Sequence, residues 1–262
     1  MPVKNVAKAV AKEMKGGIRR KSTRPVKVVK SYKEPTEADI VDSSTGSARS
    51  SGVQAEVFDD QGKPPTRNKK GELVFKDHPE FRPNLTPKQV MQRGSFGGTY
   101  FRSIYSSVTG VKYDGAEVIK EFPLDWFEGL NLKKDVLAQN YDIKRNMYKA
   151  ECGGDLNMWE GNGWIADIDP YGWFMWYCRF FQGRRCSDDE RQIARGNGVM
   201  GQKGRWRNNL VNKLLARSGS GSEEDMEAAL DDHSISPKVR QLLQHWGYRL
   251  TLEDLKAAAK RK

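Results

Sequence analysis

Cysteine, histidine and long apolar runs are scarce in this sequence of 262 residues. Its three cysteines (Cys152, Cys178 and Cys186) are too few for a disulfide scaffold. Its three histidines lie in separate segments without a CxxC pair, so no structural zinc site is predicted. No run of about 18 apolar residues occurs, which argues against a membrane-spanning helix. Residues 1–15 lack the apolar stretch of a secretory signal. We therefore expect an intracellular protein that does not contact membranes, with the nucleus preferred and organellar targeting by the N-terminal segment left open.

Sequence motifs of catalysis are also absent or weak. No GxSxG or HExxH pattern occurs. The glycine-rich stretch at residues 196–204, GNGVMGQKG, lacks the GxxxxGK[ST] pattern of a phosphate-binding loop. Asp167 and Asp169 form a DxD pair, which a turn explains as well as a metal site does. The sequence therefore predicts no metal and no cofactor, identifies no catalytic residue, and favours a role other than catalysis.

The share of apolar residues is also low, at 37% against roughly 45–50% in a typical globular chain. Part of the chain is therefore expected to be unpacked. Residues 1–35 hold eleven Lys or Arg against two acids, and this composition predicts a disordered basic arm. Residues 36–82 are first acidic and rich in Ser and Gly, then rich in Pro, which is typical of a flexible linker.

Aromatic residues, by contrast, are concentrated in one region. Residues 96–181 contain 19 of the 26 aromatic side chains of the chain. This density predicts a core domain at residues 83–217, with a C-terminal helical segment at residues 218–262 that is packed on the core or appended to it. Short strands are expected at residues 72–75 and 99–108 because of their β-branched and aromatic content. The predicted fold class is mainly α with a small β component.

Several helices have clear start signals. Thr86 followed by Pro87 is a capping residue before a favoured first helical position. Residues 173–181, WFMWYCRFF, form an apolar run whose periodicity fits a buried strand or a buried helix. We favour a helix, because the downstream segments have helical patterns, and we expect Trp173 and Trp176 to lie in the core. Further helices are expected after Ser236-Pro237 and after Thr251.

The region from residue 179 to residue 217 combines helix signals with strong positive charge. Ser187 and the three acids after it predict the start of a helix that ends at Gly196. The glycine-rich loop and a second helix at residues 205–217 follow. The region holds ten Lys or Arg against three acids, and its order of elements is that of a helix-turn-helix module. A long loop separates the two helices, however, where the simple motif has a turn of about 3–4 residues.

This pattern predicts a nucleic-acid-binding protein, with DNA preferred over RNA because a single basic helix fits the major groove of B-form DNA. The basic arm would add affinity by releasing counterions from phosphates. The predicted contact residues are Arg184, Arg185, Lys203, Arg205, Arg207, Asn209 and Lys213, together with Arg19, Arg20, Lys21 and Arg24 of the arm.

Two further hypotheses stay open at this point. Trp159 and Tyr171 lie in segments with loop character and are candidates for stacking on bases. An enzyme that acts on bases or nucleotides would have its site among Trp159, Glu160, Asp167 and Asp169. A structural or assembly subunit would use the basic tail on packaged nucleic acid, and the C-terminal helices could contact other proteins.

Three blocks of the sequence together resemble a family of uncharacterised eukaryotic proteins. They are PNLTPKQVMQRGSFGGTYFR at residues 83–102, DPYGWFMWYCRFFQGRRCSDDERQIAR at residues 169–195 and SISPKVRQLLQHWGYRL at residues 234–250. The resemblance covers about residues 80–255 and excludes the basic arm. It implies that this stretch is a single fold, and it assigns no activity and no functional residue.

Overall fold

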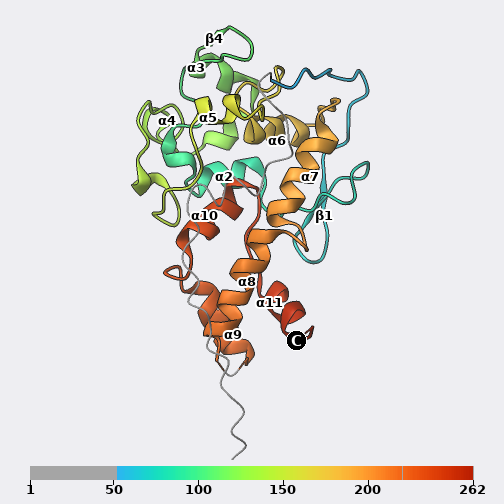
Figure 1. Cartoon of the computed structure of the whole chain (residues 1–262), viewed down its shortest axis with the longest axis vertical. Helices are drawn as coiled ribbons and strands as arrows, with labels where there is room; N and C mark the ends of the chain where they lie inside the picture. Colours follow the sequence, from blue (N-terminus) through green and yellow to red (C-terminus); the bar gives the residue numbers. More distant parts are fainter. Residues whose placement is uncertain (1–51, 220, 262) are drawn as a thin grey trace, which may run out of the picture. The chain divides into compact units, whose positions relative to one another are not determined.

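The computed structural model describes residues 52–219 and 221–261. Two small antiparallel sheets and a succession of helices make up this part of the chain (Figure 1). The prediction of a mainly α protein with a small β component is confirmed. In order, the elements are β1 (Thr66–Arg67), β2 (Leu73–Val74), α2 (Pro87–Gln92), η2 (Phe96–Gly98), β3 (Ile104–Tyr105), β4 (Lys112–Tyr113), α3 (Gly115–Val118), η3 (Ile119–Glu121), η4 (Leu124–Phe127), α4 (Leu132–Asp135), η5 (Ile143–Arg145), α5 (Leu156–Gly161), α6 (Trp173–Phe181), α7 (Asp189–Met200), α8 (Arg205–Arg217), α9 (Glu223–Asp231), α10 (Pro237–His245) and α11 (Leu252–Ala259).

Helix α2 begins as its sequence predicts. The hydroxyl of Thr86 accepts the backbone N–H of Gln89, and the side chain of Gln89 accepts the N–H of Thr86. This reciprocal pair satisfies two backbone donors that a helix start leaves open. Thr251 caps α11 in the same way. Local capping chemistry therefore fixes both of these helix starts.

Helix α6 is the centre of the apolar core, and the predicted helix at residues 173–181 is confirmed. Trp176 is fully buried, whereas Trp173 is only partly buried, so the expectation that both are in the core holds for Trp176 alone. Phe75 and Phe81 pack around α6 and are fully buried as well. Both belong to the segment predicted to be a linker, so the packed part of the chain begins well before Pro83. The arm at residues 1–35 and the first part of the linker lie outside the described residues.

Helix α7 is longer than predicted, because it runs through Gly196 and Gly198 to Met200. A Cβ atom on Gly196 would lie only 2.9 Å from the Trp173 ring, so the glycine allows α7 to pack closely on that ring. The helix also starts differently. Asp188 is its N-cap, while the hydroxyl of Ser187 accepts the N–H of Glu56 instead.

The β component is smaller than predicted. Within residues 99–108 only Ile104 and Tyr105 form a strand, and they pair with Lys112 and Tyr113. The chain before them turns through η2, where Gly97 and Gly98 have φ of 58° and 80°. These left-handed values favour glycine and end any extended segment.

The C-terminal helices pack on the same core. Helix α8 contacts α7, α9, α10 and α11 (Figure 1), and the side chains of α10 are almost all buried. The buried guanidinium of Arg240 donates to the backbone carbonyls of Ala229, Leu230, Asp232 and Ile235. One side chain therefore hydrogen-bonds the open backbone carbonyls at the carboxyl end of α9 and links this helix to α10. In the described part of the chain, no helix is both long and apolar enough to cross a membrane.

Candidate ligand pocket

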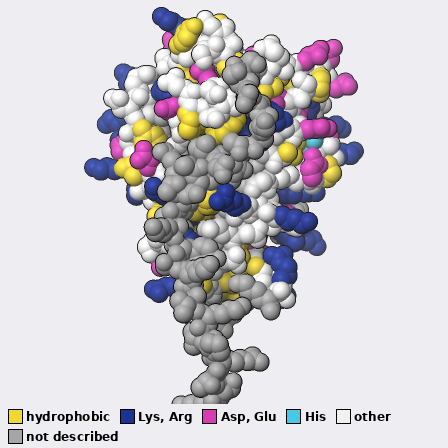
Figure 2. Space-filling model, viewed as in Figure 1, with side chains coloured by type: hydrophobic (Ala, Val, Ile, Leu, Met, Phe, Trp, Pro, Cys, Tyr) yellow, Lys and Arg dark blue, Asp and Glu magenta, His cyan; other side chains and the backbone are white. Residues whose placement is uncertain are grey.

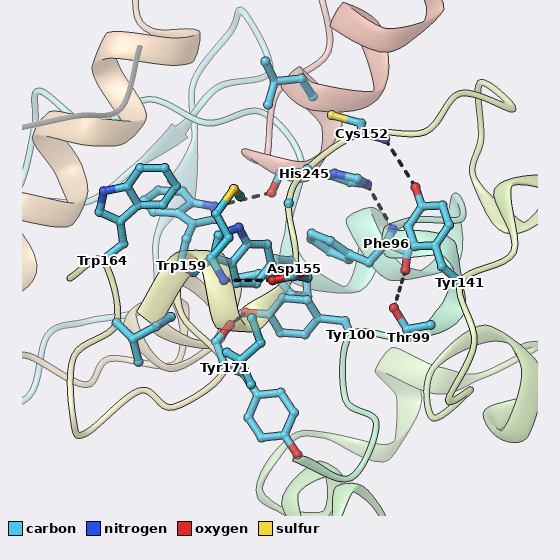
Figure 3. A pocket seen from close by; sticks show the side chains of 18 of the residues that line it. Phe96, Thr99, Tyr100, Tyr141, Cys152, Asp155, Trp159, Trp164, Tyr171 and His245 are labelled. Carbon is cyan, nitrogen blue, oxygen red and sulfur yellow. Dashed lines mark hydrogen bonds between the residues drawn. The ribbon is translucent and has the colours of Figure 1, made fainter. Parts of the chain in front are cut away.

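A cavity of about 550 Å³ opens between α5, α6, α7, α10 and the loop at residues 139–155 (Figure 3). Nine Phe, Tyr and Trp side chains line its wall. Trp159 and Trp164 lie at one end of the view, and Tyr141 and Cys152 lie at the other. The remaining aromatic side chains of its wall are Phe96, Tyr100, Tyr171, Trp173, Phe174 and Trp246.

Trp159 is the wall residue best placed to meet a ligand. It sits on α5, whose first turn is capped by Asp155 accepting the N–H of Met158 at 2.8 Å. The ring is partly buried, whereas Trp164 and Tyr171 are buried. Partial burial leaves a Trp face open for stacking, which a fully packed ring cannot offer.

The loop around Phe96 forms the opposite wall, and its backbone is strained at Phe96. Phe96 has a left-handed φ of 55°, which is unusual for a residue with a side chain. Its ring stacks on His245 with centroids 4.1 Å apart, and its N–H donates to Nε2 of His245 at 3.0 Å. Non-glycine residues in this backbone region persist where the surroundings hold them, and they gather at functional sites.

His245 is buried and uncharged. Burial lowers its pKa to about 3 from the usual value near 6.5. The hydrogen bond from Phe96 requires an unprotonated Nε2, so the geometry and the pKa agree. The imidazole therefore orients the Phe96 loop as a neutral acceptor.

Arg195 of α7 brings a positive charge into this aromatic wall. Its guanidinium carbon lies 5.5 Å from the Trp164 ring centroid and 5.7 Å from that of Trp246. Nη1 donates to Oε1 of Gln192 at 3.0 Å. Burial, followed by repulsion from Arg191, lowers the pKa of Arg195 to about 10. The pocket therefore combines flat apolar walls with charged side chains, and Arg195 lies beside two of the Trp rings, whereas Arg102 bonds the Thr99 carbonyl.

The Tyr100 hydroxyl of the lining is held by hydrogen bonds within the fold. Among the described residues, no three His, Cys, Asp or Glu side chains come together in a way that could hold a metal ion. The hydroxyl of Tyr100 donates to the Tyr171 carbonyl at 2.6 Å and accepts from the Met175 N–H at 2.8 Å. Its pKa is raised well above 10, chiefly by burial. It is therefore a structural hydroxyl rather than a general base.

The structure divides the predicted nucleic-acid contacts into two groups. Arg184 binds the buried Asp169 through two bonds, and Arg185 is buried against Asp77. Arg207 pairs with Asp254 at 2.6 Å, and Lys213 bonds the Ser236 hydroxyl. These side chains are engaged inside the fold.

The second group remains at the surface. Lys203 and Arg205 are exposed, and Asn209 is partly buried. Lys and Arg side chains gather at the lower right of the face in Figure 2, the side on which α11 lies in Figure 1. Arg19, Arg20, Lys21 and Arg24 lie outside the described residues.

The side chains named for the enzyme hypothesis have structural partners. Glu160 is buried and accepts hydrogen bonds from the hydroxyls of Ser106 and Ser107. Asp169 is buried between Arg179 and Arg184, while Asp167 accepts the N–H of Ala55. Trp159 and Tyr171, the two stacking candidates, both line the pocket, although Tyr171 is buried and donates its hydroxyl to the Arg102 carbonyl.

Arg195, His245 and Trp246 line the pocket but are not among the site residues that the sequence predicted. A signal for Arg195 was present. Once α7 is extended to Met200, Gln192, Gly196 and Val199 form a buried stripe with Arg195 at its border. The sequence prediction ended the helix at Gly196, so it did not include Val199 and did not show this stripe.

Comparison with protein-family profiles, curated proteins and solved structures finds no match for this chain.

Proposed function

We propose that this protein binds a small, flat, aromatic or conjugated molecule in the pocket. The observation that carries the proposal is a cavity of about 550 Å³ with walls that include Trp159, Trp164, Trp173 and Trp246. Ligand sites are typically concave, roughly 300–1,000 Å³ in volume, and mainly apolar with a few placed polar groups. A flat ring fills such a space best, because ring faces stack favourably.

The partly buried ring of Trp159 gives the first test. Replacing Trp159 by leucine should weaken the binding of the flat neutral probe 2-naphthamide by about tenfold or more, since stacking on one ring contributes about 1–3 kcal/mol. Isothermal titration calorimetry measures this directly, and circular dichroism checks the fold.

Tyr105→Leu is the matched control, because Tyr105 is an exposed aromatic outside the pocket lining. It should leave the affinity unchanged. Equal losses in both variants, or no binding of the probe to the parent protein, would reject the proposed site.

A second candidate, nucleic-acid binding, is favoured by the start of α8. Lys203 and Arg205 are exposed there and form no ion pair with any described residue. The N-cap is Gly204, which gives no side-chain cap to the helix. Free cations beside an uncapped helix start attract phosphate. We propose a DNA contact at this point, with the basic arm at residues 1–35 adding further phosphate contacts.

The double variant Lys203→Ala/Arg205→Ala tests this second candidate. Loss of two phosphate contacts should reduce the slope of log affinity against log salt by about 2 on duplex DNA. The control Lys133→Ala/Lys144→Ala removes the same charge from exposed positions on other elements. If both double variants bind duplex and single-stranded DNA like the parent, the start of α8 is an ordinary solvated surface.

A further inference from the structure

We infer that the ligand of the pocket carries an anionic group, a carboxylate or a phosphate monoester, which Arg195 receives beside the rings of Trp164 and Trp246. This inference rests on the proposed small-molecule function and adds the chemical class of the ligand.

The first observation is that most N–H donors of the Arg195 guanidinium have no acceptor among the described residues. A guanidinium has five N–H donors. The described residues supply one acceptor, the Gln192 amide oxygen. The Nε atom is buried and has no hydrogen-bond partner. A buried donor without a partner is costly, so its presence in a pocket wall indicates that another molecule completes the bonding.

The second step is the contrast with the neighbouring arginines. Five other partly or fully buried arginines pair with a carboxylate, and they are Arg179, Arg184, Arg185, Arg191 and Arg207. Arg102 and Arg240 donate to backbone carbonyls instead. Arg195 has no carboxylate within ion-pair distance among the described residues. Burial, followed by the charge of Arg191, lowers its pKa to about 10, and the charge of Asp188 offsets only part of this shift. Arg195 is therefore the member of this set whose counter-ion must come from outside.

The third step identifies the group that fits. A guanidinium donates and never accepts, so its partner must be an acceptor. Its planar fork matches the two oxygens of a carboxylate or a phosphate. The two rings beside the guanidinium leave the charge poorly hydrated, which strengthens its attraction to an anion. The ligand body then extends along the aromatic walls.

Three matched probes test the inference: 2-naphthamide, 2-naphthoate and 2-naphthyl phosphate. They share one flat ring system and differ in charge. In calorimetric titrations of the full chain, at least one anionic probe should bind ten or more times as tightly as the amide. The better of the two anions identifies the carboxylate or the phosphate as the source of the charge.

Variants at Arg195 locate the effect. Arg195→Met should bind the amide as the parent does and lose the preference for the anion. Arg195→Lys should keep part of the preference, because it retains charge without the planar fork. Arg217→Met is the control, since Arg217 is exposed and lies outside the pocket. It should keep the full preference.

The outcomes separate the two proposals. If the parent binds the amide and both anions equally well, or if Arg195→Met and Arg195→Lys both keep the preference, the anion subsite is rejected while the pocket stands. If no probe binds at millimolar concentration, the pocket proposal fails and the anion subsite fails with it. If Arg195→Met folds poorly, the anion subsite is still tested by Arg195→Lys. The rise in melting temperature of the parent protein with each probe tests it as well.

Discussion

Replacement of Gly98 by alanine is expected to destabilise the protein by about 4 kcal/mol or more, an effect in the range reserved for strained or clashing sites. Gly98 has φ of 80°, and a Cβ atom there would overlap the carbonyl oxygen of Lys134. The left-handed backbone alone costs an alanine roughly 1–2 kcal/mol. The overlap adds more, because the atom in the way is backbone and cannot rotate aside. Denaturant titration followed by circular dichroism measures the loss.

Gly129→Ala separates the two contributions. Gly129 has almost the same φ, 78°, but no atom outside its chain neighbours lies within 4 Å of the Cβ position. This control should therefore lose only the backbone part, about 1–2 kcal/mol. If the two variants lose the same stability, close packing of η2 on α4 does not constrain Gly98.

The second large effect is acid sensitivity that comes from His245. Its pKa is lowered by burial to about 3 in the folded protein, while it stays near 6.5 in the unfolded chain. Between these values the unfolded state binds the proton and the folded state does not. The free energy of unfolding contributed by this group is therefore fully present above pH 6.5 and falls as the pH falls. The loss is about 1.4 kcal/mol per pH unit, or about 3 kcal/mol at pH 4.

His245→Gln should remove this part of the acid sensitivity. The glutamine oxygen can accept the Phe96 N–H in place of Nε2 but cannot take up a proton. Urea titrations at several values from pH 7 to pH 4 should show a shallower decline for the variant than for the parent. Parallel curves for the two proteins would mean that protonation of His245 does not limit stability in acid.

Helices with local start signals could be predicted from the sequence. Thr86 with Gln89, and Thr251 with Asp254, form reciprocal capping pairs within four residues of chain. Such contacts depend on neighbours in the sequence and on nothing else. The apolar run of α6 predicted burial, because it has a single charge in nine residues, but its periodicity did not distinguish a helix from a strand.

Elements that depend on distant partners could not be predicted. Gly196 and Gly198 have poor helix propensity, and local rules end a helix there. The structure continues α7 because Gly196 lies against the rings of Phe81 and Trp173, which are far away in the sequence. Ser187 shows the same effect, since a distant segment at Glu56 takes the hydroxyl that would otherwise cap α7.

The pocket illustrates the limit for functional residues. Trp159 was named because its segment has loop character, although the structure places it on α5. His245 and Arg195 could not be named, because their roles depend on burial next to other segments. Positive charge in the sequence also did not predict which Lys and Arg side chains are exposed. Arg184 and Arg185 are bound to the carboxylates of Asp169 and Asp77 inside the fold, and a one-dimensional charge count does not distinguish such pairs from free cations.

The position of α10 has a consequence for the order of events during synthesis. Leu242, His245 and Trp246 supply one wall of the pocket, while the other walls are made more than forty residues earlier in the chain. A nascent chain that has been translated only as far as α8 therefore presents an open aromatic surface around Trp173 and Phe96. The cavity closes only when α10 has left the ribosome and docked. In that interval the aromatic surface is open to chaperones, and a ligand of the proposed kind would meet a complete pocket only after α10 has docked.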